Sequence, residues 1–489
     1  MKEANDNELI FGISADEKGY SFECSIESAL AEANSELEEL DLKIEETVES
    51  IKNLTPDCDK TDYALAVSSG ALCGIMDIFL VAKPGETPLG DITDKWFGEM
   101  TERFAKVCGW DGTINEKLPV PDKLHSAIEH LEKRFKIPYD HTSAGPGLNS
   151  VYKITPNNHH FKSLAHNPTL CGLFFSILDQ FSNTTHFVSQ GEIFIRDYEG
   201  KFELEGTNIP SKLFSAFVNW IGHIISDNSG SNSSKGRGQG IPSPLWTWMN
   251  DVAVIRAGLG VESTEFEKDF NDFAVKLYEN SYDARFQATQ SIPVFINEML
   301  VRMLYSIRRI FKFYSETPRG ERSFIGLWKS CEPFSNVSVK RMLTVAHGTF
   351  CLLDVGDAVG RGFAAGGGYF NVMEFAMRLN LPGLGRFGIS MMGEANRGFK
   401  VYRLNKEKWS LESDRIILVD HIEGLRILAD VYDDADLLKF IDDFERSDAY
   451  EKAFNKTVEL AEKRGVPQDR ILKNKSDIDA YFEGGNNNG

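Results

Sequence analysis

Histidine and aspartate residues recur at helical spacing inside several apolar stretches of this chain. His223 and Asp227 are four residues apart and share one face of a predicted helix. His160 and His166 lead into a second apolar stretch. Imidazole and carboxylate groups bind divalent metals, and helical proteins build such sites from facing helices. If these helices meet, the four side chains would bind a divalent metal that activates water.

A further His–Asp pair lies on a different predicted helix. His347 and Asp354 are seven residues apart and again share one face. Together with His223 and Asp227, they are the residues to which we assign a predicted catalytic acid–base role. No complete metalloprotease motif of the H-E-x-x-H type is present. Each pair therefore also fits a simpler role, as a satisfied polar contact in a helical core.

Basic residues mark two candidate sites for an anionic ligand. The Gly/Ser-rich loop at 228–244 carries Lys235 and Arg237, which could hold a phosphate group together with backbone amides. The loop lacks the P-loop motif, so a flexible linker is the alternative. Arg302 and Arg309 lie on an apolar predicted helix, where they could contact an anionic ligand or lipid headgroups. Pairing with acidic parts of the same chain is the alternative for these two arginines.

The elements that must position these residues are long apolar stretches. An ionisable group in such a stretch has to be paired, neutralised or functional, because burial disfavours its charged form. The stretches are therefore either core helices around a polar site or helices that insert into a membrane. They lie at 63–82, 164–181, 212–227, 293–314 and 341–361.

The stretch at 63–82 is the one whose length best fits a membrane span. Asp77 lies within it, and one central aspartate offsets the insertion energy of several leucine-like residues. The balance is close to neutral and favours a buried core helix.

Two further patterns suggest helix association. Residues 26–54 place apolar side chains at heptad spacing, which predicts either a dimeric coiled coil or one arm of an intramolecular helical hairpin. Residues 356–398 are dense in glycine, which permits close helix approach in short packed or re-entrant helices.

Composition limits the class of protein. The 489 residues carry a net charge of −20, which argues against binding to nucleic acid. The polar, acidic N-terminus does not fit a secretory signal peptide. Seven cysteines, odd in number and without a C-x-x-C pair, are typical of a reducing compartment. We therefore expect a cytoplasmic protein that also contacts membranes.

Four short segments carry a resemblance to a group of uncharacterised bacterial proteins with no established activity. The resemblance extends from about Tyr63 to about Glu394 and implies a bacterial, intracellular origin, without assigning a role to any residue. The segments are Asp140-His141-Thr142-Ser143, His166-Asn167-Pro168-Thr169, Gly240-Ile241-Pro242 and Ala346-His347-Gly348-Thr349.

The predicted fold is mainly α, a multi-helix bundle with one or two small β-hairpins. We expect an acidic helical arm at 1–62, an apolar helical core at 63–400 and an acidic helical region with a disordered tail at 401–489. One hairpin is predicted near 191–206, from strands at 192–197 and 201–205, and a second from strands at 400–404 and 409–411.

Two functions follow from these patterns. The first is a helical assembly or scaffold protein that associates with membranes, with itself or with partner helices through its glycine-rich apolar helices. The alternative is a soluble metal-dependent hydrolase of a phosphorylated substrate, acting through the His–Asp pairs.

Overall fold

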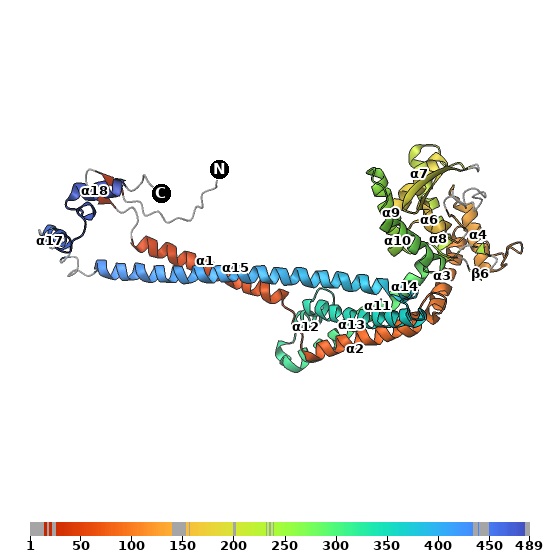
Figure 1. Ribbon diagram of the computed structural model, residues 1–489. Helices are drawn as coiled ribbons and strands as arrows, with labels where there is room; N and C mark the ends of the chain where they lie inside the picture. The colour runs from red at the N-terminus through yellow and green to blue at the C-terminus, as the bar shows by residue number, and fades with distance from the viewer. Residues whose placement is uncertain are drawn as a thin grey trace. The chain divides into compact units, whose positions relative to one another are not determined.

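The protein is mainly α-helical, which confirms the predicted fold class (Figure 1). The chain forms two compact units, one of residues 1–54 and 399–489 and one of residues 55–398. These boundaries differ from the predicted three-part division because the N-terminal arm and the C-terminal region share one unit. The computed structural model describes residues 14–16, 19–21, 26–138, 153–155, 157–198, 202–230, 232–233, 236–237, 239–433, 439 and 449–484.

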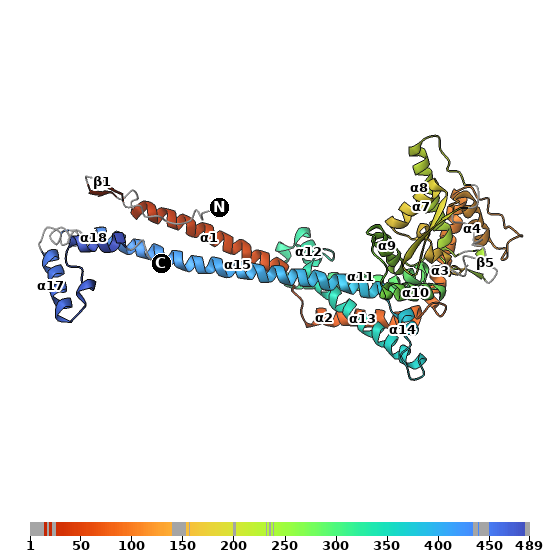
Figure 2. The same ribbon diagram turned by 45° about the horizontal axis from the view of Figure 1, so that its top comes forward.

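The first unit is built on the predicted heptad helix, α1 (Ile26–Leu54). Its apolar seam packs on the later part of α15 (Leu381–Asp433), and the two helices lie side by side in both ribbon views (Figures 1 and 2). Arg415 on α15 pairs with Asp41 on α1 at 2.6 Å. The seam thus has a partner within the same chain. The unit also contains β1 (Ser14–Asp16), β2 (Gly19–Ser21), α17 (Ala449–Lys463), η4 (Gln468–Arg470) and α18 (Lys475–Gly484).

The second unit holds the apolar stretches. Each of the five predicted stretches lies wholly or largely within helices. Its elements are α2 (Lys60–Met76), η1 (Asp77–Val81), α3 (Pro88–Val107), α4 (Lys123–Arg134), α6 (His159–Lys162), η2 (Leu164–His166), α7 (Leu170–Ser182), β3 (Thr184–Ser189), β4 (Glu192–Asp197), α8 (Ile209–Asn228), β5 (Asn232–Ser233), β6 (Gly236–Arg237), α9 (Pro244–Gly258), α10 (Glu265–Glu279), α11 (Ala284–Glu316), η3 (Arg319–Glu321), α12 (Phe324–Cys331), α13 (Val337–Ala365), α14 (Val372–Arg378) and the start of α15.

Helices α2 and α13 run parallel and pack closely, with α11 beside them (Figures 1 and 2). The close approach depends on Gly70 and Gly74, one helical turn apart on α2. A Cβ on Gly70 would collide with the backbone carbonyl of Ala346, and a Cβ on Gly74 would crowd Leu353. This small-residue contact is the kind that brings apolar helices together at short range.

Two helical segments are long and apolar enough to cross a membrane, at Lys60–Val81 and Val337–Ala365. Within their most apolar windows, 39% and 50% of the residues are buried inside the protein. Core helices of soluble proteins pass the same test. Because Asp77 and Asp354 are both buried on the facing sides of this pair, we treat the two helices as a core.

The hairpin predicted near 191–206 is formed by a different pair of strands. Strand β4 is present at the predicted position, but it pairs antiparallel with the preceding β3, and no residue of 202–205 is in a strand. The two-residue turn at Gln190 and Gly191 has positive φ at both positions, 53° and 73°, which is the geometry that joins twisted strands. This turn was the missed signal.

The predicted second hairpin at 400–404 and 409–411 is wrong, because α15 continues without interruption through both segments. Lysine and glutamate between them are good helix formers, and Lys408 pairs with Glu412 one turn later at 3.2 Å. The glycine-rich segment forms the end of α13, then α14, then the start of α15. It is therefore helical, but its last helix has 53 residues and is not one of the short helices that were predicted.

Candidate metal centre

Three elements bring the predicted metal ligands together. His160 lies on the four-residue α6, His166 on η2, and His223 and Asp227 one turn apart on α8. The indole of Trp220, also on α8, donates to the carbonyl of Ala165 at 2.9 Å. This hydrogen bond ties η2 to α8 beside the site.

The four side chains point their donor atoms at one another. Nε2 of His166 and Nε2 of His223 each lie 3.3 Å from Oδ2 of Asp227. The two nitrogens are 2.9 Å apart, and Nε2 of His160 lies 3.8 Å from the same carboxylate oxygen. A tetrahedral zinc ion with ligands at about 2.0–2.1 Å separates its donors by about 3.3–3.4 Å. The observed separations bracket that value.

The cluster is almost fully buried. His166, His223 and Asp227 are 1–2% exposed and His160 is 7% exposed. Within the described residues, Oδ2 of Asp227 and Nδ1 of His223 have no partner with full hydrogen-bond geometry. Buried polar atoms are normally paired, and an unpaired carboxylate oxygen facing three imidazoles is the arrangement that a cation completes.

The protonation states suit metal binding. Burial lowers the pKa of His166 to about 4 and, together with the neighbouring imidazoles, lowers the pKa of His160 well below its ordinary value. Burial alone would raise the pKa of Asp227, but the imidazoles of His223 and His160 hold it below its ordinary value. At neutral pH the imidazoles of His160 and His166 are therefore neutral and the Asp227 carboxylate is ionised, which are the forms that bind metals.

A hydroxyl that sequence reasoning missed orients one ligand. Oγ of Ser163 lies 2.9 Å from Nδ1 of His166, the ring nitrogen that faces away from the cluster. Metal-binding histidines usually donate this second N–H to a fixed acceptor, which sets their tautomer. The close sequence spacing of Ser163 and His166, three residues apart, was the available signal.

His347 and Asp354 do not join this centre. Both lie on α13 in the bundle with α2 and α11, whereas His223 and Asp227 lie on α8. Nδ1 of His347 is 3.4 Å from the amide nitrogen of Asn297, so the side chain is a buried polar contact of the bundle. The four residues predicted to share an acid–base role thus fall into two separate clusters.

Asp354 belongs to a second buried polar group. Both of its carboxylate oxygens accept from the backbone N–H of Asn380, at 3.2 and 3.0 Å. The Asn380 side chain donates to Asp77 at 2.6 Å and to the carbonyl of Gln290 at 2.9 Å. Sequence reasoning found both aspartates but missed Asn380, which joins three helices at the start of α15.

The predicted phosphate-binding loop is only partly described. Lys235 lies outside the described residues, and Arg237 lies on β6, where only its backbone is described. The return of the loop is fixed by Gly240, whose N–H donates to Asp283 at 2.9 Å and whose carbonyl accepts from Tyr278 at 2.6 Å. The loop therefore begins at the end of α8, next to Asp227, and its far end is held by the hydrogen bonds of Gly240.

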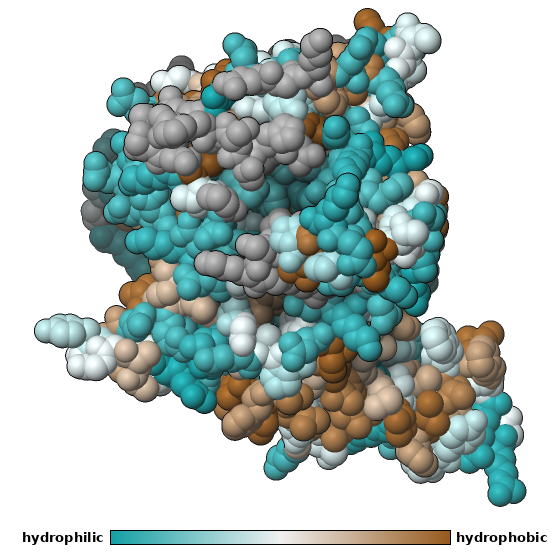
Figure 3. Space-filling model, turned by 90° about the vertical axis from the view of Figure 1, so that its right-hand side faces the viewer, coloured by the Kyte–Doolittle hydropathy of each residue, from teal (hydrophilic) through white to brown (hydrophobic). Residues whose placement is uncertain are grey.

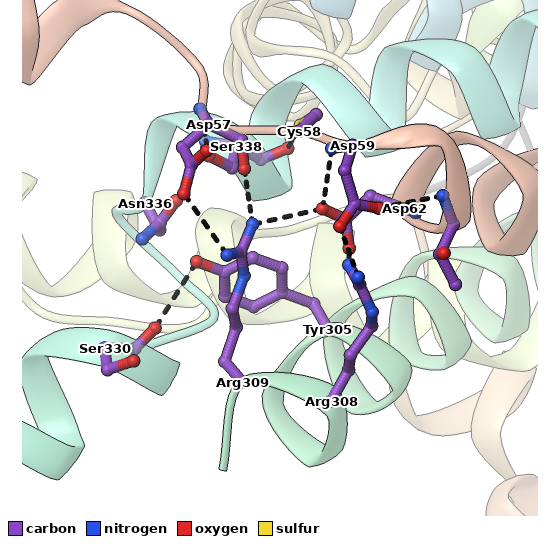
Figure 4. Close-up of polar contacts among 11 residues, drawn as sticks. Asp57, Cys58, Asp59, Asp62, Tyr305, Arg308, Arg309, Ser330, Asn336 and Ser338 are labelled. Carbon is purple, nitrogen blue, oxygen red and sulfur yellow. Dashed lines mark hydrogen bonds and ion pairs between the residues drawn. The ribbon is translucent and has the colours of Figure 1, made fainter. Parts of the chain in front are cut away.

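The two arginines predicted to bind a ligand have carboxylate partners in the chain itself. Arg302 pairs with Glu298 at 2.5 Å. Arg309 pairs with the fully buried Asp62 at 3.0 Å and with Asp57 at 3.3 Å, in a network with Arg308 that joins α11 to the start of α2 (Figure 4). Internal pairing is therefore what the structure provides for both guanidinium groups.

Comparisons with known proteins complete the description of the site. The chain matches no protein family, no curated protein and no solved structure. The class that fold and site define is a mainly α-helical protein with a buried His/Asp cluster of metal-ligand geometry.

Proposed function

We propose that this protein is a metal-dependent hydrolase that acts on a phosphorylated substrate. The observation that carries the proposal is the buried cluster of His160, His166 and Asp227, whose donor atoms lie within 4.8 Å of one another, with Nε2 of His223 3.3 Å from Oδ2 of Asp227. The metal would activate water for attack on phosphorus, the P–O bond to the leaving alcohol would break, and the alcohol would take up a proton.

Zinc is the metal that the donor set fits best. Imidazole nitrogen with a single carboxylate, in tetrahedral arrangement, is a zinc donor set, whereas magnesium prefers octahedral oxygen ligands. Iron, nickel and copper also accept imidazole, so metal analysis has to decide among them.

Catalysis requires one coordination position for water, and His160 is the ligand that we expect to leave it open. It is the most exposed of the four residues and lies farthest from Oδ2 of Asp227. Its helix α6 is only four residues long. Binding by all four side chains would instead produce a closed structural site.

The phosphate group of the substrate is assigned to the loop after α8. Asp227 is the penultimate residue of α8, so Lys235 and Arg237 follow this proposed metal ligand within ten residues of sequence. Amide-rich loops with cations are the usual partners of phosphate oxygens.

Metal analysis of the purified full chain tests the proposal. We expect about one zinc per chain in the wild type, loss of the metal in His223→Ala, and retention in His347→Ala, which removes an equally buried histidine elsewhere. The metal-loaded wild type should hydrolyse p-nitrophenyl phosphate, and His160→Ala should keep metal. Metal-free wild type, or equal metal in the His223 and His347 variants, would refute the site.

A cobalt-substituted sample distinguishes the two coordination modes. Tetrahedral cobalt absorbs several times more strongly in the visible range than five-coordinate cobalt. Addition of inorganic phosphate should change the spectrum if a position is open. An unchanged spectrum, together with bound metal and absent hydrolysis, would establish a structural metal site and reject the hydrolase.

We propose contact with a lipid bilayer as a second function, carried by a separate observation. Large apolar side chains face outward on α2, η1 and α11, where Leu72 is 59%, Phe79 66% and Phe295 65% exposed. Apolar side chains also gather in the lower part of the end-on view (Figure 3). Exposed apolar surface of this extent is typical of an interaction site.

The glycines support the same idea. Gly356 and Gly360 on α13, and Gly385 and Gly388 on α15, have no neighbour within 4 Å of an added Cβ. They are therefore not used for packing among the described residues. In vesicle flotation we expect the purified full chain to rise with liposomes. A protein that does not float but forms oligomers in sedimentation velocity would show self-association in place of membrane contact.

A further inference from the structure

One exposed apolar surface has a defined shape and composition. The segment from Thr317 to Asn336, here named the α12 tip, leads from the end of α11 into α13 and contains α12. Phe324 is 78%, Ile325 80% and Trp328 52% exposed. Trp328 lies three positions after Ile325 and four after Phe324, so it neighbours both of them on the surface of α12.

The tip is held in place from its opposite side. Cys331 is buried, and its carbonyl accepts from Oγ of Ser306 on α11 at 2.8 Å. The hydroxyl of Ser323 caps the start of α12 by accepting from the N–H of Gly326 at 3.0 Å. The apolar face therefore projects from a fixed helix.

Three cations accompany the apolar face. Arg319, Arg322 and Lys329 are exposed, and none has a carboxylate within ion-pair distance in the part of the chain that the structure describes. Arg322 donates to the backbone carbonyls of Thr317 and Tyr314, at 3.0 and 2.8 Å, and so remains charged without a counterion. The segment also carries Glu321 and Glu332, so its net charge is +1, in a chain with a net charge of −20.

We propose that the α12 tip docks on the surface of a bilayer that contains anionic lipid. Aromatic and aliphatic side chains of an amphipathic helix enter the boundary between headgroups and acyl chains, where tryptophan is enriched. Nearby cations then contact the lipid phosphates. Aromatic and arginine side chains are also typical of protein interfaces, so a protein partner is one outcome that the test below distinguishes.

This inference names the surface and the lipid class for the proposed bilayer contact, and it rests on that second function. The tip contacts the bilayer from one side, without crossing it. The contribution of the tip to vesicle binding should depend on both its charge and its apolar area. This dependence distinguishes it from bilayer contact made by the outward face of α2 alone.

Vesicle sedimentation of the full chain tests the proposal. We expect the wild type to bind vesicles of phosphatidylcholine with phosphatidylglycerol and to bind pure phosphatidylcholine vesicles much more weakly. The double variant Phe324→Ser/Trp328→Ser should bind the anionic vesicles at least about tenfold more weakly. The variant Lys329→Glu should weaken binding severalfold and remove part of its salt dependence.

The matched control is Trp409→Ser, which removes a tryptophan on α15 that is more exposed than Trp328, at 78% against 52%. Circular dichroism and metal content should be unchanged in all variants. If the tip variants bind as the wild type does, the tip is rejected while bilayer contact stands. If the wild type ignores both vesicle types, both ideas are rejected. Altered self-association in the tip variants, with unchanged vesicle binding, would assign the tip to a protein partner.

Discussion

The buried carboxylate pair in the helical core should make the stability of the bundle depend on pH. Burial raises the pKa of Asp354 to about 6, and burial together with the facing Asp354 raises the pKa of Asp77 well above its ordinary value. Among the described residues, the groups facing the pair are Asp357 and Cys351 on α13, Tyr282 before α11 and the Asn380 amide.

The sign follows from the direction of the shift. A carboxyl group whose pKa is raised in the folded state binds its proton more tightly there, so protonation favours folding. The Asp354 contribution is fully present below the ordinary pKa of 3.8 and is lost as the pH rises through about 6. A shift from 3.8 to about 6 corresponds to about 3 kcal/mol.

The perturbation is Asp354→Asn. In the wild type, a proton forms a hydrogen bond between the side chains of Asp77 and Asp354. In the variant, the amide oxygen can still accept from the N–H of Asn380, and the amide nitrogen can donate to Asp77 in place of that proton. The variant should therefore lack the Asp354 contribution to the pH dependence. Relative to the variant, the wild type should lose about 3 kcal/mol of stability between pH ~4 and pH ~7.5.

Native-state hydrogen exchange of peptides from α13 is the assay, because it reports the opening of this bundle alone. Comparison at equal pH cancels the intrinsic exchange rate. The ratio of wild-type to variant protection should fall about 100-fold over the stated range. Asp357→Asn removes a neighbouring carboxylate whose charge raises the pKa of both Asp77 and Asp354, so its slope should lie between those of the wild type and Asp354→Asn. Parallel profiles for wild type and Asp354→Asn would refute the shared-proton argument.

Three further changes test other parts of the structure. Gly70→Ala should destabilise the bundle by about 1–3 kcal/mol because its Cβ meets the backbone of α13, whereas Gly356→Ala, in open space on a helix, should stabilise it by up to about 1 kcal/mol; equal effects in thermal melts would contradict the packing. Arg309→Met should cost about 1.5–3 kcal/mol in urea unfolding because it removes one of the two guanidinium groups on the buried Asp62 and leaves Arg308 as its counterion, and Asp62→Asn should restore part of the loss. Chelation should lower the melting temperature, by an amount equivalent to about 4 kcal/mol for a metal held at 1,000 times its Kd, and added EDTA without effect on metal-loaded protein would exclude a stabilising ion.

Helical spacing predicted part of the candidate metal centre but not its assembly. Placing His223 and Asp227 on one face needs only the period of a helix. Bringing His166 to them requires α6, η2 and α8 to pack together across 57 residues of sequence. That packing depends on distant contacts, such as the hydrogen bond from Trp220 to Ala165, which no local pattern contains. The same limit explains why His347, with an equally regular spacing, lies elsewhere.

The hairpin error has a local cause. The strand at β4 was found from its alternating pattern, but its partner was sought after it, across Tyr198, Glu199 and Gly200. The two-residue connection at Gln190 and Gly191 is shorter and has the backbone geometry that antiparallel strands need. The short turn therefore decides which neighbouring segment pairs with β4.

The two buried polar groups show why apolar helices with single ionisable residues resist interpretation from sequence. The physical rule requires each buried charge to be paired, neutral or functional, but does not state which. Asp227 faces three imidazoles with an oxygen left unpaired, and Asp354 faces a second carboxylate and a backbone amide. We propose that a cation completes the first arrangement and that a proton completes the second. The partners that decide between these outcomes, Ser163 in one case and Asn380 in the other, are neutral residues whose importance appears only when the helices are packed.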